Sequence, residues 1–354
     1  MKKSFKKSLI ILLILIILIG VGITYYMIKE KPTEYQSNMN IVLSLEDEIE
    51  DNTVWCGTFN LIWNDLKNDL AKQDIVFNPQ LKVVENLNKG TFTTKELDEA
   101  SYYKVYGTPT LELKREIEKA IKEKFNETSD ILDDFDWGSH SDKDYFLYAM
   151  LKKTFEFPKK FTELNDGTFN GVENVKYFGI NNKTNDKVRE QVKALYYSNE
   201  DDFAIKLLTK TNDEVIIVKG NNDKTFKDIY DNTIEKSKSY GGRTSFNDAD
   251  TLRIPNITFK LKKSFPDIEK KEFLFANGDI YMIDQTLQTI EFELDKKGGK
   301  VKSEAGMMVK ELAMLEERNF NVNSTFTIFL IEKDKNLPYF AAKISDINNV
   351  QRIK

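Results

Sequence analysis

Near the C-terminus, apolar and polar residues follow three successive patterns. Residues 289–299, TIEFELDKKGG, alternate apolar with polar and end in a glycine pair, which predicts a half-buried strand. Residues 300–319 show no clean period and no cluster of turn residues. Two apolar runs, Phe326–Ile331 and Tyr339–Ile344, flank the polar turn EKDKNLP and predict a β-hairpin. A connector of about twenty residues between such elements is either a functional loop or a sign of a wrong assignment.

Upstream, the spacing of apolar residues predicts an alternation of helices and short strands. The helices are expected at Trp55–Leu70, Thr94–Tyr103, Thr110–Phe125 and Thr225–Ser237. The strands are expected at 175–180, 191–197, 203–208, 214–218 and 252–261. The run Tyr145–Leu151 fits either a strand or a helix. The fold class is therefore α+β, with helices and strands mixed along the chain.

The first 28 residues are basic and then apolar. Residues 1–8 hold four lysines, and the twenty residues 9–28 are nearly all apolar. A helix of that length rises about 30 Å, enough to cross a hydrocarbon core. The lysines favour a cytoplasmic tail at 1–8. No small-x-small cleavage site follows the apolar run, so the sequence does not indicate a cleaved signal peptide. We expect an uncleaved signal-anchor, single-pass in the cell membrane, with the C-terminal domain extracytoplasmic.

Residues 29–52 are polar and acidic and are expected to form a linker, so that one extracytoplasmic domain would occupy 53–354. The formal charge is -5, with four lysines in the tail, so the remaining chain is acidic. This charge argues against a nucleic acid partner. A single cysteine, Cys56, and a single histidine, His140, exclude disulfide frameworks and multi-cysteine or multi-histidine metal sites. We expect neither a metal nor a cofactor.

The tetrapeptide Ser139-His140-Ser141-Asp142 contains every residue type of a hydrolase triad. Triad members come from separate segments in space, and adjacent residues cannot form their geometry. The chain also has no Gly-x-Ser-x-Gly elbow to expose a nucleophile. This stretch is therefore predicted to be a loop, and the chain is not expected to be an enzyme.

The C-terminal pattern resembles that of the serpins. The strand ending at Asp295–Gly298, the long connector, and the closing runs Phe326–Glu332 and Leu337–Ile344 carry the likeness. Leu252–Leu261 is similar to a proline-containing strand of that family, and Lys143–Phe161 is similar to a strand and turn in its middle. The match is best over residues 252–344 and poor before Lys114.

This resemblance implies a serpin-like fold of mixed β-sheets with a cluster of helices. It also implies an exposed reactive-centre loop at about 300–319 that presents a bait bond to a serine or cysteine protease. After cleavage the loop would insert into a central sheet and carry the trapped protease with it. Counting from the hinge glycine places the bait bond at Leu312–Ala313, and counting back from Phe326 places it at Met314–Leu315. The hinge and the side chains buried on insertion would be Gly298, Gly299, Val301, Ser303 and Ala305.

The loop departs from the inhibitory pattern at its start. Lys296 stands where an acidic residue is usual, Gly299 where Thr or Ser is usual, and Lys300 and Lys302 replace small residues. These departures favour an alternative, a non-inhibitory surface binding or structural module of the same fold. Two further alternatives stay open. Residues 305–318 are good helix formers and fit a helical connector, and the many carboxylates leave room for an unrelated cell-surface enzyme.

Overall fold

The computed structural model describes residues 38–138, 140–297 and 317–351. They belong to one compact unit that spans Ser37–Lys354. The predicted tail at 1–8 and signal-anchor at 9–28 lie outside the described residues. Within the part of the chain that is described, no helix has both the length and the apolar character needed to cross a bilayer.

The largest sheet has seven strands in the order β1-β2-β19-β18-β11-β10-β9. Their bounds are β1 Asn40–Ile41, β2 Thr53–Cys56, β19 Phe340–Ile344, β18 Phe326–Glu332, β11 Asp213–Lys219, β10 Asp202–Leu208 and β9 Val192–Asn199. All seven residues of β18 are buried, as expected for an apolar strand covered on both faces. The predicted terminal hairpin is confirmed, because β18 and β19 pair antiparallel.

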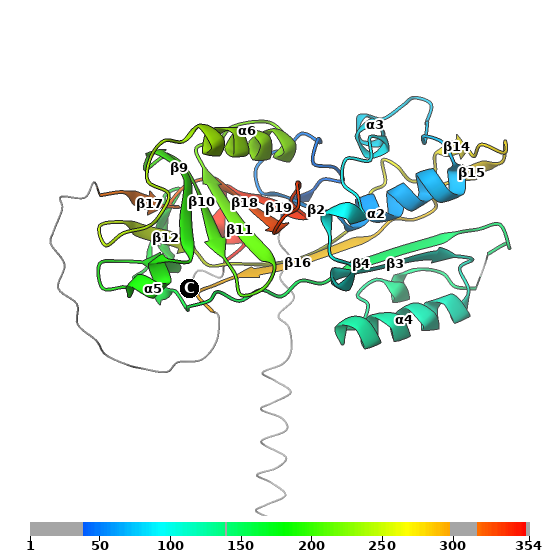
Figure 1. The fold of residues 1–354 in the computed structure, drawn as a ribbon. Coiled ribbons are helices and arrows are strands. Elements are labelled where there is room, and N and C mark those ends of the chain that lie inside the picture. Colours follow the sequence, from blue (N-terminus) through cyan, green and yellow to red (C-terminus); the bar gives the residue numbers. More distant parts are fainter. Residues whose placement is uncertain (1–37, 139, 298–316, 352–354) are drawn as a thin grey trace, which may run out of the picture. The chain divides into compact units, whose positions relative to one another are not determined.

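Aromatic side chains pack on both faces of β18 and β19. On one face lies α6 (Phe226–Ser239), whose Tyr230 ring is 5.5 Å from Phe329 (Figure 1). On β19, the Phe340 ring stacks at 4.6 Å on Phe292 of β16 (Gln288–Leu294). The predicted helix at 225–237 is confirmed, and Thr225 caps it by accepting a bond from the Asp228 amide.

A second sheet has four strands in the order β17-β12-β8-β5. They are β17 Asn319–Asn321, β12 Thr251–Pro255, β8 Tyr177–Ile180 and β5 Thr162–Glu163. The strand predicted at 252–261 is in fact two strands, because β12 ends at Pro255 and β13 (Ile257–Lys263) pairs with β16 instead. Proline has no N–H to donate, so it suits the end of a ladder.

Two further ladders, β13–β16 and β3–β4, are two-stranded and are not hydrogen-bonded to each other. β3 is Tyr102–Gly107, and β4 is Phe146–Leu151, which settles the ambiguous run as a strand. β16 alternates buried and exposed residues, as its sequence predicts. Beyond the strands, the Phe161 amide donates to the Lys296 carbonyl at 3.2 Å. The chain that leads into β5 therefore contacts the chain just after β16.

Two small hairpins and four helices complete the described part. The hairpins are β6 Gly167–Phe169 with β7 Val172–Val175, and β14 Glu272–Leu274 with β15 Ile280–Met282; the helices are α2 Thr58–Asp65, α3 Lys82–Asn88, α4 Leu111–Phe125 and α5 Asp186–Arg189. α4 is predicted correctly, and Thr110 caps it. Its residues Leu113, Ile117 and Ile121 form a smaller core with β4, separate from the main core.

Two helix predictions need correction. Residues 94–103 are not a helix: two short 3-10 turns lead into β3, whose tyrosines and valine favour an extended chain. The helix expected from Trp55 begins only at Thr58, because Trp55 and Cys56 belong to β2 and pair with β19. After α2 the chain continues as a π-helical segment, Leu66–Ala71.

The linker predicted at 29–52 ends earlier than expected. Residues 40 and 41 form β1, which pairs in parallel with β2. Five apolar side chains of this stretch are at most 8% exposed, namely Met39, Ile41, Leu43, Leu45 and Ile49. Their burial outweighs the acidic residues between them, so the domain begins before the boundary predicted at residue 53.

Candidate functional site

The predicted hinge and bait residues lie outside the described residues. They are Gly298, Gly299, Val301, Ser303, Ala305, Leu312, Ala313, Met314 and Leu315. What the structure does describe is the two ends of the segment that carries them. The first end follows β16, and the second end leads into β17. These two strands belong to different sheets.

At the first end, Lys296 has two partners. Its ammonium forms an ion pair with the Glu163 carboxylate on β5, and its carbonyl accepts the bond from Phe161. The basic residue just after β16 is thus paired with an acidic residue of β5. Glu163 is 68% exposed, and exposed pairs of this kind contribute about 0–1 kcal/mol. The pair therefore contributes little to the stability of the fold.

At the second end, Arg318 is 4% exposed and is held by side chains and carbonyls. Its Nε and Nη2 donate to the two oxygens of Asp250 at 3.0 and 2.9 Å. Nη2 also donates to the Ser245 carbonyl at 3.0 Å, and Nη1 donates to the Arg243 carbonyl. The guanidinium lies 5.1 Å from the Phe320 ring centre. The chain therefore enters β17 from a buried bidentate ion pair.

Asp250 is the acceptor that gathers these donors. It is fully buried, and Arg243 donates to its two oxygens at 2.7 and 3.1 Å. The Asn247 amide adds a bond of 2.8 Å. Burial alone would raise the pKa of the Asp250 carboxyl, but the hydrogen bonds from Arg318 and Arg243 outweigh it, so the pKa lies below its usual value. The carboxylate is therefore charged in the folded protein at neutral pH.

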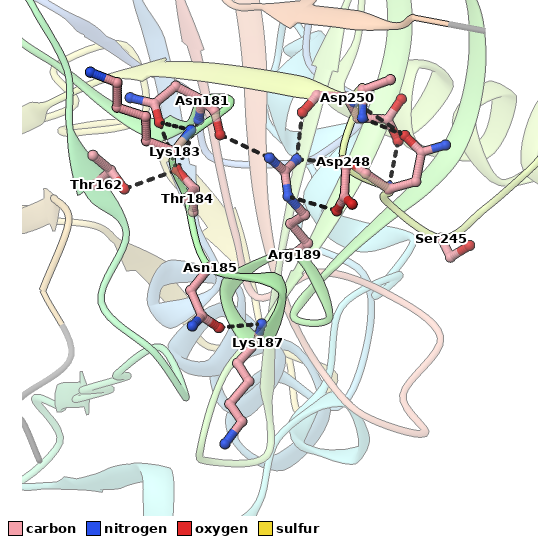
Figure 2. Close-up of polar contacts among 12 residues, drawn as sticks. Thr162, Asn181, Lys183, Thr184, Asn185, Lys187, Arg189, Ser245, Asp248 and Asp250 are labelled. Carbon is pink, nitrogen blue, oxygen red and sulfur yellow. Dashed lines mark hydrogen bonds and ion pairs between the residues drawn. The ribbon is translucent and has the colours of Figure 1, made fainter. Parts of the chain in front are cut away.

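A third arginine, Arg189, binds the backbone of the same turn with its side chain, as Figure 2 shows. Arg189 is 3% exposed and donates to the carbonyls of Asn247 at 2.8 Å and Asp250 at 2.6 Å. It also donates to the Asn181 carbonyl at 2.8 Å, just after β8. We call the three guanidiniums on turn 247–250 the arginine node. The node joins the ends of three strands of the four-stranded sheet, β8, β12 and β17.

Sequence reasoning missed this node, although one signal was present. The chain has only six arginines among its 52 basic residues, and three of the six meet at turn 247–250. Arginine is preferred over lysine where a buried planar donor must bind a carboxylate or several carbonyls. In a lysine-rich chain, the few arginines therefore indicate positions where a buried planar donor is needed.

A second cluster, of buried charged side chains, binds the chain that follows β4. Lys153 lies 3.0 Å from Asp213 and 2.7 Å from Glu332, at the ends of β11 and β18. The Tyr339 hydroxyl donates to Asp213 at 3.1 Å, and burial raises the pKa of Tyr339 well above its usual value. The Ser101 hydroxyl, just before β3, donates to Glu332 at 3.1 Å. The β3–β4 ladder is thus joined to the seven-stranded sheet by buried charges.

The other candidate residues show no catalytic geometry. Cys56 is a buried free thiol whose pKa is raised by burial, as expected of a core residue. The Ser141 amide donates to the Asp144 carboxylate at 2.7 Å, which is a local contact within a turn. Ser139 lies outside the described residues. Over the described ranges, no group of three or more His, Cys, Asp or Glu side chains could hold a metal ion.

The two-stranded ladders leave strand edges open. Among the described strands, β16 pairs with β13 and β4 pairs with β3, so each of β16 and β4 has one edge without a strand partner. Such an edge presents backbone N–H and C=O groups that bind an added extended segment. β16 is also the last described strand before residue 298.

Comparison with known proteins gives structural neighbours only. No protein-family model matches the chain, and no curated protein matches it. Similar solved structures include thyroxine-binding globulin in complex with thyroxine, at 10% identity and a TM-score of 0.47, over 84% of this chain and 93% of that chain. They also include Serpin48 of the insect Tenebrio molitor, at 11% and 0.43, over 84% and 92%. Mouse protein-Z dependent protease inhibitor is similar at 11% and 0.48, over 84% and 91%.

Proposed function

We propose that this chain is a membrane-anchored, serpin-like inhibitor of a serine or cysteine protease that acts outside the cytoplasm. One observation carries the proposal. β16 has an open edge and leads directly into the segment that resembles a reactive-centre loop, while β17 after that segment lies in another sheet. We infer that this segment, whose two ends lie in different sheets of the described part, pairs along β16 once it is cut.

The chemistry follows from ordinary protease action. The protease nucleophile attacks the carbonyl carbon of the bait residue, the peptide C–N bond breaks, and the new amine leaves with a proton. The bait residue stays bonded to the enzyme, as an ester of a serine or a thioester of a cysteine, until water attacks. The freed segment then pairs along β16 before that hydrolysis, and the covalently attached enzyme moves with it. A bait residue of Leu312 or Met314 suits a protease with an apolar specificity pocket.

Insertion requires that one face of the new strand be buried. The inward positions would be Gly299, Val301, Ser303 and Ala305, which are small or apolar and can be buried at little cost. Lys300 and Lys302 would point outward with their charges in water. Val301 and Lys302 therefore provide a matched pair of test positions, one inward and one outward.

The test is to incubate the full-length chain in detergent with elastase-like and subtilisin-like proteases and to look for an adduct that survives SDS. The wild type is expected to form it. Val301→Glu would bury a carboxylate during insertion and is expected to convert the inhibitor into a substrate, whereas Lys302→Glu should still form the adduct. Cleavage of the wild type with no adduct contradicts the inhibitory proposal.

The second candidate is a surface binding or structural module of the same fold. Lys300 and Lys302 stand where small residues are usual and favour it, because even outward-pointing lysines would lose side-chain freedom on insertion and would slow it relative to hydrolysis. Clean cleavage of the loop without an adduct would select this candidate. The location of either candidate is tested separately: we expect the chain to stay with membranes after carbonate extraction, and a Leu15→Lys, Ile16→Lys double variant to be released.

A further inference from the structure

The Lys153 ammonium lies between two buried carboxylates of the seven-stranded sheet. Asp213 and Glu332 are direct partners across the β11–β18 ladder. Nζ of Lys153 lies 3.0 Å from Oδ1 of Asp213 and 2.7 Å from Oε1 of Glu332, and the three side chains are 13%, 3% and 0% exposed. Like charges that face each other across a ladder destabilise it, and a buried ion pair is often no more stable than apolar side chains of the same volume. Stability alone therefore does not account for this cluster.

The two carboxylates have different hydrogen-bond donors. The Asp98 amide donates to both oxygens of Glu332, at 3.0 and 2.8 Å, which holds this carboxylate beside the lysine amine. Asp213 accepts from two hydroxyls instead: Tyr339 donates to Oδ1 at 3.1 Å, and Thr211 donates to Oδ2 at 2.9 Å. Burial raises the pKa of Tyr339 well above its usual value, so its hydroxyl keeps its proton at neutral pH. Glu332 is thus placed to accept a proton from the amine, and each oxygen of Asp213 has a donor beside it.

We infer that Lys153 and Asp213 condense to a side-chain amide, with Glu332 as the group that carries the protons. Nζ attacks Cγ of Asp213, which is at most one C–O bond farther away than Oδ1. The C–N bond forms, the Cγ–Oδ2 bond breaks, and Oδ2 leaves as water with the two protons that Nζ gives up through Glu332. Tyr339 donates to Oδ1, the oxygen on which negative charge develops. An ammonium and a carboxylate together lose one water molecule, so the step needs no oxidant and no co-reactant.

The amide would be a covalent cross-link within the domain. It joins the chain that follows β4 to the first residue of β11, so the β3–β4 ladder is bonded to the seven-stranded sheet. It closes a loop from residue 153 to residue 213, and such a loop restricts the unfolded chain and stabilises the folded one. The sequence has one cysteine and can form no internal disulfide, whereas a lysine amide needs no thiol. This cross-link goes beyond the proposed function and does not depend on it.

The test is peptide mapping by mass spectrometry of the full-length chain, purified in detergent and digested after denaturation. The wild type is expected to yield a branched peptide that joins the segments containing Lys153 and Asp213, with a mass lower than their sum by one water molecule. Asp213→Asn should yield the same branched peptide with loss of ammonia, because nitrogen is then the leaving group. Lys153→Arg should yield only linear peptides, because a guanidinium keeps the charge but stays protonated and cannot attack.

Two further variants test the role of Glu332. Glu332→Gln keeps the size of the side chain and should form the cross-link roughly a hundredfold more slowly. Lys206→Arg is the matched control, because Lys206 lies 3.0 Å from Glu214 in the same sheet, and this variant should keep the cross-link in full.

Three results would overturn the inference. In the first, the wild type yields Lys153 and Asp213 only in separate linear peptides. In the second, the amide joins Lys153 to Glu332, which contradicts the assigned electrophile. In the third, Glu332→Gln cross-links as fast as the wild type, which removes Glu332 as the proton carrier. The yield of protease adduct does not enter any of these readouts, so this inference and the proposed function fail separately.

Discussion

Single residues matter most in this protein where charges are buried. Lys153 neutralises two carboxylates, Asp213 and Glu332, whose side chains are 3% and 0% exposed. Replacing a partner in a buried ion pair leaves an uncompensated charge, which costs more than the pair itself contributes. At Lys153 two carboxylates would be left facing each other. The loss in the free energy of unfolding on replacing Lys153 should therefore be among the larger ones for single substitutions.

We predict that Lys153→Met lowers the free energy of unfolding by about 3–5 kcal/mol, measured by urea denaturation. The control is Lys210→Met, which breaks a 2.7 Å pair with Glu156. Those side chains are 43% and 53% exposed, so the control should lose less than about 1 kcal/mol. Similar losses in the two variants would show that Lys153 is not holding buried charge.

Asp250 gives stability a dependence on acid. Because its pKa is lowered in the folded state, its contribution is complete above the unfolded pKa of about 3.9 and is lost as pH falls through the lower folded value. We predict that the stability difference between the wild type and Asp250→Asn is constant from pH 7 to about pH 5 and shrinks in stronger acid. Urea unfolding at a series of pH values measures it. A difference that is as large in strong acid as at neutral pH would contradict the assignment.

At the scale of elements, the sequence predicted the helices and strands whose structure is decided by residues within the element itself. β16, the β18–β19 hairpin, α4 and α6 were found because alternation, apolar runs and helix caps lie within each element. The failures lie where distant partners decide. Residues 40–41 become a strand by pairing with β2, and the run 252–261 divides because its halves pair with β8 and β16. The division did leave local signals, because Pro255 has no N–H for a ladder and the buried apolar positions shift from 252 and 254 to 257, 259 and 261.

The pairing of β8 with β12 depends on a glycine. A Cβ at Gly179 would lie 1.9 Å from the Leu252 carbonyl oxygen, closer than any real contact. We predict that Gly179→Ala separates these strands and costs more than about 2 kcal/mol, within the range of severe backbone clashes. Unfolding temperature and amide exchange in β12 measure the effect. Gly241→Ala is the control, since its Cβ would meet nothing within 4 Å, and it should be nearly neutral. Equal effects would show that the strands can move apart without cost.

At the scale of the whole molecule, the candidate site combines predicted and unpredicted parts. The sequence predicted β16 and the β18–β19 hairpin, which flank the candidate segment, because each is contiguous in the chain. It did not reveal the partners that hold the ends of that segment. Lys296 meets Glu163, and Arg318 meets Asp250 at a separation of 68 residues. The fold decides which residues form such ion pairs. Charge alone could not identify the partners, because the chain holds many other lysines and acidic residues.

A single cut in the segment between β16 and β17 would divide the chain into two pieces. The C-terminal fragment would contain β18, which is wholly buried and pairs with β11 over seven residues. We therefore expect the two pieces to stay together in native conditions and to separate in SDS. If the freed end pairs along β16, each new backbone hydrogen bond contributes about 0.5–1.5 kcal/mol, so the cut protein should unfold at a higher temperature than the intact one. Val301→Glu, cut in the same way, should show no rise. A cut wild type that unfolds at the same or a lower temperature would mean that the open edge of β16 does not take up its own chain, and the non-inhibitory module would then be the better account.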